Sequence, residues 1–381
     1  MLGATLLWGG RGIVRTASSF GVEPEVKSPV VVRCCLEPIE IAPLPCTSAF
    51  LVEAETGTVL YDQNADDPHG PASLVKMMLQ LLVYEDLASG RLHLSDRVRV
   101  SKNAATMGGS QVFLRVGETR SLSDLLDAIA IASANDASMA VAEHVAGSEA
   151  AFVERMNAKA ERLGCTQTHF VNVHGLDLRN QGRNVTSARD LATIARALVR
   201  YPRALQVSST KRKPFGGDGF QLESTDKLLG RFEGLDGLKT GWTPRAGGCF
   251  VATAQRDGVR LIAVILAARP GRARFRVAER LLEAGYARRP HWIDVLREGE
   301  PLGGGAASAD PGPKESQAAA AGGTVRLLLE EGRAQEVSSR LRTTPSAGAS
   351  PDSDAAAGLW VDLRLDGRTI ATVPARVARG G

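Results

Sequence analysis

The sequence is poor in aromatic residues and has no cysteine pattern that would hold a metal. Aromatic side chains make up 5% of the residues, and charged ones 23%. The five cysteines are Cys34, Cys35, Cys46, Cys165 and Cys249. They form no C-x-x-C pair and lie near no histidine cluster, so neither a zinc site nor a disulfide framework is indicated. We expect buried, reduced thiols and predict no metal and no cofactor.

The chain also lacks a dense basic block and a long apolar run. Its 46 basic and 42 acidic residues give a net charge of +4 and are spread along the chain, so nucleic-acid binding has no support. No stretch is long enough to span a membrane. The first residues, MLGATLLWGGRGIVRTASS, are interrupted by glycines and arginines before a signal-peptide core could form, so no secretory signal is predicted.

The length of 381 residues exceeds that of one ordinary core and favours two domains. We predict an irregular N-terminal leader or arm over residues 1–45, a main domain over 46–288, and a β-rich domain over 289–381. Within the last, residues 303–323 and 343–358 are low-complexity loops. Strand alternation between and after those loops, with turns at Gly332 and Gly367, indicates a small all-β domain.

The main domain is predicted to be α/β, of the α+β kind, with an antiparallel sheet flanked by helices. A hairpin is expected around the turn Glu55-Thr56-Gly57, and alternating strands from Gly237 to Ala268 around Arg256-Asp257-Gly258. Helices are expected over residues 73–90, 122–132, 136–146, 149–163, 187–200 and 271–286. The first has Leu or Met on every face, which predicts a helix buried all round.

The tetrad Ser73-Leu74-Val75-Lys76 opens that buried helix. Three residues apart on a helix, the amine of Lys76 can reach the hydroxyl of Ser73. A serine hydroxyl becomes a nucleophile when a base takes its proton, and a lysine kept neutral by its surroundings can be that base. The helix N-terminus also favours developing negative charge. The pattern S-x-x-K alone is weak, because a serine cap and a surface lysine would also satisfy it.

Two further elements strengthen the interpretation. Ser133-Ala134-Asn135 lies between two predicted helices, where Ser133 can relay a proton and the amide of Asn135 can pair with a substrate peptide bond. Lys239-Thr240-Gly241 lies in a predicted strand. Lys239 and Thr240 suit a substrate carboxylate, and Gly241 would let an extended substrate approach the strand edge. Together the three elements indicate acyl transfer.

S-x-x-K, S-x-N and K-T-G in this order resemble the penicillin-recognising serine enzymes. The surrounding text resembles the low-molecular-weight D-alanyl-D-alanine carboxypeptidases of the peptidase S11 kind. Matching phrases include "LVEAETGTVLYDQNAD", "PASLVKMM", "GGSQVFLRVGET", "SANDASMAVAEHVAG", "FVNVHGLD" and "DGLKTGWTPRAGGCFVATAQRDGVRLIAVILAA". The resemblance runs from about Ser48 to Tyr286, and more faintly through the β-rich tail. It implies a serine transpeptidase or β-lactamase-like domain.

The resemblance also implies the activity and the roles. The enzyme would remove the terminal D-alanine from peptidoglycan stem pentapeptides and would bind β-lactams covalently. The implied site comprises Ser73 as nucleophile, Lys76 as base, Ser133, Asn135 and Lys239 as the polar cluster, Thr240 and an arginine for the terminal carboxylate, and the backbone N–H groups of Ser73 and Trp242 as oxyanion hole. That arginine is Arg274, with Arg269 and Arg272 as rivals. Trp242, where many members carry histidine, is a departure that bears on substrate preference. His174 is a candidate general base, but a loop-stabilising role is favoured.

Three alternatives stay open. A class A β-lactamase needs a glutamate between S-x-N and K-T-G to activate water, and residues 164–222 contain none. A D,D-endopeptidase acting on cross-links would use the same elements, although such relatives tend to lack a second domain. A catalytically inert wall-binding scaffold would show a damaged motif, and none is damaged.

The implied substrate lies outside the cytoplasmic membrane, so an extracytoplasmic location is expected even though no signal is visible. The tail TVPARVARGG lacks the long amphipathic helix that anchors several members of the family. Peripheral association with the membrane or the wall is left open.

Overall fold

The computed structural model describes residues 30–177, 182–216, 219–296, 301–302, 319–321, 324–342 and 360–377. The segment examined for a secretory signal, the low-complexity segment 343–358 and most of the segment 303–323 lie outside these residues.

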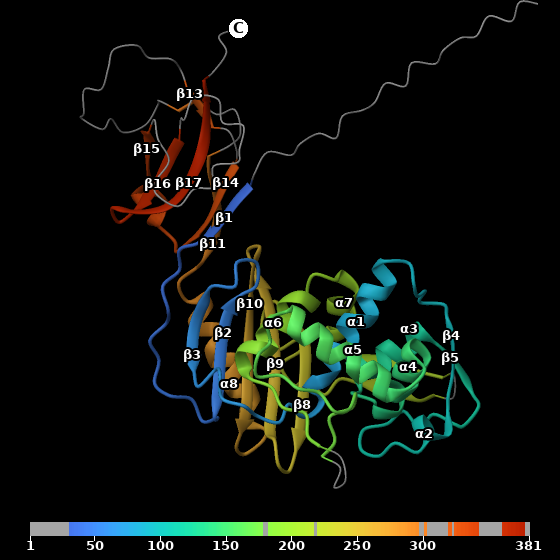
Figure 1. The fold of residues 1–381 in the computed structure, drawn as a ribbon. Coiled ribbons are helices and arrows are strands. Elements are labelled where there is room, and N and C mark those ends of the chain that lie inside the picture. Colours follow the sequence, from blue (N-terminus) through green and yellow to red (C-terminus); the bar gives the residue numbers. More distant parts are fainter. Residues whose placement is uncertain are drawn as a thin grey trace, which may run out of the picture.

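The main domain is built on a five-stranded antiparallel sheet in the order β3-β2-β10-β9-β8 (Figure 1). Its strands are β2 (Ser48–Glu53), β3 (Val59–Gln63), β8 (Leu235–Thr243), β9 (Gly247–Arg256) and β10 (Val259–Ala268). The turns predicted between β2 and β3 and between β9 and β10 are both confirmed. Strand β8, which carries K-T-G, lies at one edge of this sheet.

Successive residues of the strands face two different hydrophobic cores, as the twofold period of a strand requires. On β2, Phe50 and Val52 belong to the core shared with the helical half of the domain, whereas Ala49 and Leu51 belong to the core beneath helix α8 (Ala273–Tyr286). The main domain therefore has helices on both faces of its sheet.

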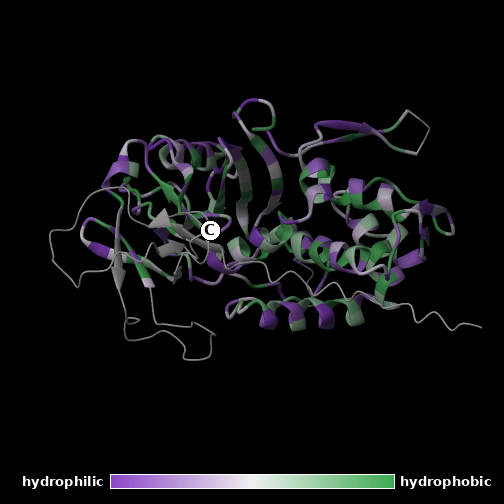
Figure 2. Ribbon diagram, turned by 90° about the horizontal axis from the view of Figure 1, so that it is seen from above, coloured by the Kyte–Doolittle hydropathy of each residue, from purple (hydrophilic) through white to green (hydrophobic). Residues whose placement is uncertain are grey.

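The predicted helices are present with small shifts in their ends. They are α1 (Lys76–Ala88), α3 (Leu122–Ile131), α4 (Asn135–Ala146), α5 (Glu149–Arg162), α6 (Ala188–Leu198) and α8. The structure adds two short helices, α2 (Lys102–Ala105) and α7 (Pro202–Ser208). It also adds two small antiparallel sheets of two strands each, one of β4 (Arg97–Arg99) with β5 (Thr119–Ser121) and the other of β6 (Arg212–Pro214) with β7 (Gln221–Glu223). Figure 2 shows that hydrophobic and hydrophilic residues alternate along the helices.

The first helix begins differently from the expectation. A 3₁₀ turn, η1 (Ala72–Val75), carries Ser73, and the α-helix itself begins at Lys76. Ala72, the first residue of this turn, has a positive φ of 49°, which lies outside the range of a right-handed helix. The prediction that this helix is buried all round is confirmed, since residues 76–84 of α1 are all buried.

A β-rich region forms the remainder, with its own core. One sheet has the order β1-β14-β11 and the other β12-β13-β17-β16-β15. The strands are β1 (Val30–Cys34), β11 (His291–Leu296), β12 (Pro301–Leu302), β13 (Ala319–Ala321), β14 (Thr324–Leu329), β15 (Ser338–Arg342), β16 (Trp360–Leu365) and β17 (Arg368–Val377). The turn at Gly367 is confirmed, but Gly332 leads into a 3₁₀ turn, η2 (Arg333–Glu336), before β15.

Strand β1 comes from the segment predicted to be an irregular arm. It pairs in parallel with β14, almost three hundred residues later in the chain, and so joins the C-terminal sheet (Figure 1). A parallel partner this distant leaves no local turn signal, which is why strand alternation alone did not reveal it.

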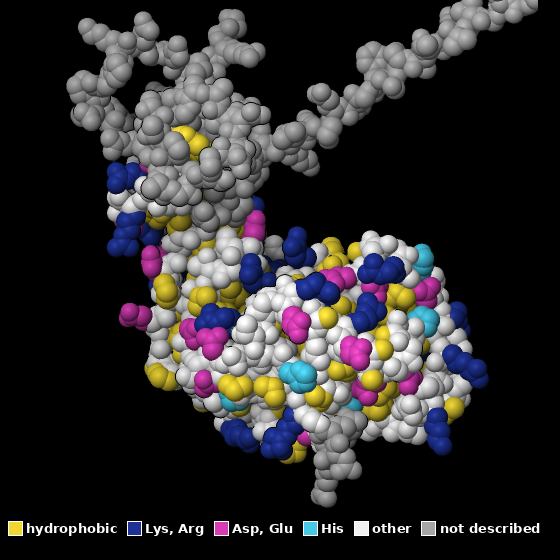
Figure 3. All heavy atoms as spheres, in the orientation of Figure 1, with side chains coloured by type: hydrophobic (Ala, Val, Ile, Leu, Met, Phe, Trp, Pro, Cys, Tyr) yellow, Lys and Arg dark blue, Asp and Glu magenta, His cyan; other side chains and the backbone are white. Residues whose placement is uncertain are grey.

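The surface carries both charge signs. On the face shown in Figure 3, basic and acidic side chains are intermixed rather than gathered into one large patch. Over the part of the chain that the structure describes, we find no helix whose length and apolar character would suffice to cross a bilayer.

Candidate active site

Ser73 lies where η1 meets the edge strand β8. The contact is close at Gly241, because a Cβ atom there would lie 3.0 Å from both the carbonyl oxygen of Pro71 and the backbone nitrogen of Ser73. The sequence interpretation gave this glycine a different reason, namely the approach of substrate. The structure shows that the missing side chain makes room for the backbone of the serine turn.

Lys76 is fully buried at the base of this turn. Its Nζ lies 3.1 Å from Ser73 Oγ, 2.7 Å from Asn135 Oδ1 and 2.8 Å from the carbonyl oxygen of His174. Two of these three partners can only accept hydrogen bonds. Among the described residues no carboxylate forms an ion pair with this amine, and the charge of the buried Asp136 only partly offsets the cost of burying an ammonium group.

The carbonyl of His174 is held in place by a tight loop. Gly175 has a φ of 85°, and a Cβ atom there would lie 2.1 Å from the carbonyl oxygen of Ala72. The ring of His174 accepts a hydrogen bond from the backbone N–H of Leu176 at 3.0 Å. Burial, and the positive charge of Lys76 next to it, lower the pKa of His174 to about 4. The ring therefore stabilises the loop, and the backbone of this residue contacts the site.

The second element lies at the start of α4. Ser133 adopts a left-handed conformation, with a φ of 61°, and its Oγ accepts a hydrogen bond from Lys239 Nζ at 2.9 Å. Asn135 is the first residue of α4 rather than a loop residue. Its Oδ1 faces Lys76, and its Nδ2 donates to the carbonyl of Gly108 at 2.7 Å, which fixes the orientation of the amide.

The third element completes the cluster. Lys239 is buried on β8, and besides Ser133 its amine contacts the carbonyl oxygen of Thr240 at 2.9 Å. The hydroxyl of Thr240 hydrogen-bonds to that of Thr225 in the preceding loop. The three sequence elements, separated by 60 and more residues, are thus joined in a cluster that runs from Ser73 through Lys76 and Asn135 to Ser133 and Lys239.

Burial dominates the electrostatics of both lysines. Desolvation, reinforced by the charge of Lys239, holds the pKa of Lys76 well below its usual value of 10.5. Desolvation and the charge of Arg274 lower the pKa of Lys239 to about 7. The charge of Lys239 thus disfavours the ammonium form of Lys76, and burial disfavours the charged form of both lysines.

Of the three arginines considered from the sequence, Arg274 alone acts on this cluster. It is half-buried in the first turn of α8 and donates to the carbonyl of Gly271 at 2.6 Å. Arg269 and Arg272 are exposed, and Arg269 donates to the carbonyl of Arg245 at 3.2 Å.

Trp242 lies beside these arginines. Its side chain is 57% exposed and lies against Gly271, where a Cβ atom would be 2.8 Å from the indole.

Three features of the site had no clear sequence signal: the carbonyl of His174, the glycine that follows it and Thr225. A backbone carbonyl has no side-chain signature, although the phrase "FVNVHGLD" contains two of the three features. In the described residues no cluster of His, Cys, Asp and Glu could hold a metal ion.

A helix-flanked antiparallel sheet with S-x-x-K beside its edge strand is the fold of the penicillin-recognising serine transpeptidases. The chain belongs within this class to the D-alanyl-D-alanine carboxypeptidase family, peptidase S11, whose profile matches residues 39–270. The family resemblance and the fold predicted from the sequence are thereby confirmed.

Individual relatives are similar to different extents. D-alanyl-D-alanine carboxypeptidase DacF of Bacillus subtilis is 39% identical over 243 residues, which cover 63% of this chain and 62% of that protein. The match therefore spans less than two thirds of that relative. Penicillin binding protein 5 from Haemophilus influenzae has a similar structure, with a TM-score of 0.73 and 29% identity over 89% of this chain and 98% of that one. Penicillin-binding protein D2 from Listeria monocytogenes, in its ampicillin-bound form, matches with a TM-score of 0.60 and 34% identity over 65% of this chain and 100% of that one.

Proposed function

We propose that this protein is a serine-type D-Ala-D-Ala carboxypeptidase that removes the terminal D-alanine from peptidoglycan stem pentapeptides and is acylated by β-lactams at the same serine. The names of its relatives and the ampicillin complex of a structural neighbour support this reading. The observation that carries it is the contact between the buried amine of Lys76 and Ser73.

The number of hydrogen bonds that a neutral Lys76 can donate supports its role as base. A neutral amine has two N–H groups and one lone pair. The oxygens of Asn135 and His174, at 2.7 and 2.8 Å, take both N–H groups. The lone pair then faces the hydroxyl of Ser73, which donates its proton to Lys76 as Oγ attacks the peptide carbonyl carbon.

The remaining cluster supplies a proton to the leaving group and binds its carboxylate. As the peptide C–N bond breaks, the D-alanine nitrogen takes a proton from Ser133, which is replenished through Lys239 at 2.9 Å. Lys239, Thr240 and Arg274 provide the positive charge and the hydroxyl that a terminal carboxylate requires. The backbone N–H groups of Ser73 and Trp242 stabilise the oxyanion.

Deacylation relies on the same amines. Water attacks the ester, its proton passes to the lysine cluster, and the shortened peptide leaves with Ser73 restored. Within the described residues no carboxylate hydrogen-bonds to Ser73, Lys76 or Lys239, so a glutamate-activated water, as in a class A β-lactamase, has no support. A β-lactam keeps its amine tethered after ring opening and obstructs the water, so its adduct should persist.

The substrate chemistry implies an extracytoplasmic site of action. Stem peptides ending in D-Ala-D-Ala occur in the wall and its precursors, so we place the enzyme in the periplasm or cell envelope, with peptidoglycan as its macromolecular partner. Peripheral contact with the membrane or the wall is part of this proposal.

The test combines labelling with product analysis. Wild-type protein and the variants Ser73→Ala and Ser209→Ala are exposed to a fluorescent penicillin. The proposal expects labelling of wild type and of Ser209→Ala, whose serine is an exposed residue at the end of α7, and none of Ser73→Ala. A Ser73→Ala protein that labels while folded by circular dichroism refutes the assignment.

Release of D-alanine from a pentapeptide is then compared with cleavage of a cross-linked dimer. Faster release from the pentapeptide supports the carboxypeptidase, and faster cleavage of the dimer would assign an endopeptidase. A wild-type protein that neither labels nor cleaves would be the inert scaffold.

A further inference from the structure

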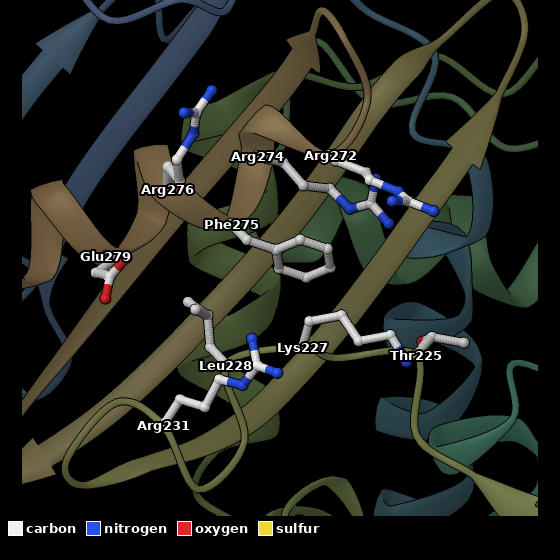
Figure 4. A pocket seen from close by; sticks show the side chains of 9 residues that line it. All are labelled: Thr225, Lys227, Leu228, Arg231, Arg272, Arg274, Phe275, Arg276 and Glu279. Atoms are coloured by element: carbon white, nitrogen blue, oxygen red, sulfur yellow. The ribbon is translucent and has the colours of Figure 1, made fainter.

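A pocket lies behind Arg274, between the first turns of α8 and the loop that leads into β8. It has a volume of about 540 Å³. Figure 4 shows the ring of Phe275 near its centre, with Arg272 and Arg274 on one side and Leu228 and Arg231 on the other.

The lining is strongly basic. Five cations contribute to it, against the single carboxylate of Glu279; the five are Lys227, Arg231, Arg272, Arg274 and Arg276. The nearby carboxylate of Asp226 accepts a hydrogen bond from the backbone of Leu228 at 2.8 Å, within its own turn. Even with both acids ionised, the pocket carries an excess of about three positive charges.

Three of these cations lack the ion-pair partners that arginines have elsewhere on the same domain. Arg256 pairs with Glu283 at 3.0 Å, and Arg260 pairs with Asp236 at 2.8 Å. Over the described residues, Lys227, Arg231 and Arg272 form no ion pair at all. Clustered cations without counter-charges repel one another, so an anion from outside the chain would relieve the cluster.

The start of α8 adds to the positive potential. This helix of 14 residues has no acidic residue in its first turn and no side-chain cap, and instead begins with arginines. Arginine at a helix N-terminus is unfavourable because the helix dipole is already positive there. Arg274 itself is half-buried: its Nη1 donates to the carbonyl of Gly271, whereas its Nε is buried and has no hydrogen-bond partner.

The floor of the pocket is apolar. Leu228 is buried, and the guanidinium of Arg274 lies over the ring of Phe275, with Cζ 4.5 Å from its centroid. A bare oxyanion would occupy only a small part of 540 Å³. The lining therefore suits an anionic head joined to a larger body that can lie against Leu228 and Phe275.

We propose that this pocket binds a phosphate group carried on an organic molecule, beside the Ser73 cluster and not within it. Phosphate fits better than a single carboxylate because it brings up to two negative charges and three oxygens that guanidinium forks can engage. The pocket shares Arg274 and Thr225 with the active site, but its other cations have no part in the acyl-transfer cluster. The inference goes beyond the proposed function and does not depend on it.

Binding is measured by isothermal titration calorimetry on the full chain at physiological ionic strength, with glucose 6-phosphate, glucuronate and glucose as probes. The test protein carries Lys227→Gln and Arg231→Gln. The control carries Arg99→Gln and Lys102→Gln, which remove the same two charges from exposed positions at the other end of the main domain (Figure 1). A parallel arm measures binding to vesicles of phosphatidylglycerol in phosphatidylcholine and of phosphatidylcholine alone.

The proposal expects the test protein to bind at least about tenfold more weakly than wild type and control, because two charge-assisted contacts are lost. If the test protein binds glucose 6-phosphate more weakly, the ligand is a soluble molecule. If only its binding to phosphatidylglycerol vesicles is weaker, the ligand is a lipid headgroup. The proposal is overturned if neither probe distinguishes the test protein from the control, or if glucuronate binds as tightly as glucose 6-phosphate. Either failure would leave the penicillin-labelling test unaffected.

Discussion

Replacing Lys76 with methionine should change how the stability of the protein depends on pH. Methionine has a similar length and volume, and it cannot be protonated. In the folded protein the pKa of Lys76 is held well below 10.5, because burial and the charge of Lys239 disfavour the ammonium form. In the unfolded chain the same amine returns to about 10.4.

The sign follows from counting protons. Between the two pKa values the unfolded chain holds one more proton at Lys76 than the folded chain, so the free energy of unfolding rises with pH. One proton corresponds to about 1.4 kcal/mol per pH unit. Above about pH 10.4 both states are neutral and the penalty is absent; it grows as pH falls toward the folded-state pKa. Within the pH range between the folded-state pKa and about 10.4, wild type should therefore gain about 1.4 kcal/mol per pH unit that the Lys76→Met variant does not.

Urea denaturation at several pH values measures this difference. Lys76→Met also leaves the oxygens of Asn135 and His174 without a donor, which lowers stability at every pH, but only the slope reports the proton. Titrating thiols and tyrosines contribute equally to both proteins and cancel.

Two further variants sharpen the experiment. Lys102→Met, at an exposed position on α2, should leave the wild-type slope unchanged. Lys239→Met should lose the same slope above pH 7 and match wild type below it, because the pKa of Lys239 is about 7. A Lys76→Met protein with the wild-type slope would mean that Lys76 is charged when folded, and it would refute Lys76 as the base.

Three more outcomes are expected. Gly175→Ala should unfold the His174 loop or abolish penicillin labelling, since its Cβ would lie 2.1 Å from the carbonyl oxygen of Ala72. The control is Gly164→Ala, at a similar φ of 74° but in open space. It should lower the free energy of unfolding, measured by urea denaturation, by only about 1 kcal/mol and keep penicillin labelling. A protein of residues 36–289, from which β1 and β14 are removed together, should label within about threefold of the wild-type rate, and a larger loss in a folded sample would give the β-rich region a part in the chemistry. Intact mass spectrometry should show a penicilloyl adduct on Ser73 that lasts minutes, whereas turnover at about ten per second or faster would indicate a β-lactamase.

The sequence by itself determined most helices and the central strands of the main domain, and the order of its three motifs. Hydrophobic periodicity and turn residues act over a few positions, so helices such as α3, α4 and α5 and the turn at residues 256–258 were placed within a residue or two. The spacing of Ser73 and Lys76 is equally local, and their contact follows from one turn of backbone.

Only the tertiary structure decided the contacts that set the chemistry. Lys76 meets partners 59 and 98 residues away, and its depressed pKa follows from their packing around it. Tertiary structure also decided that Arg274 lies near Lys239, that the serine turn approaches Gly241 closely, and that β1 pairs with β14. Burial and close approach depend on chain segments that meet only after folding, and the short-range patterns of a sequence do not encode those distances.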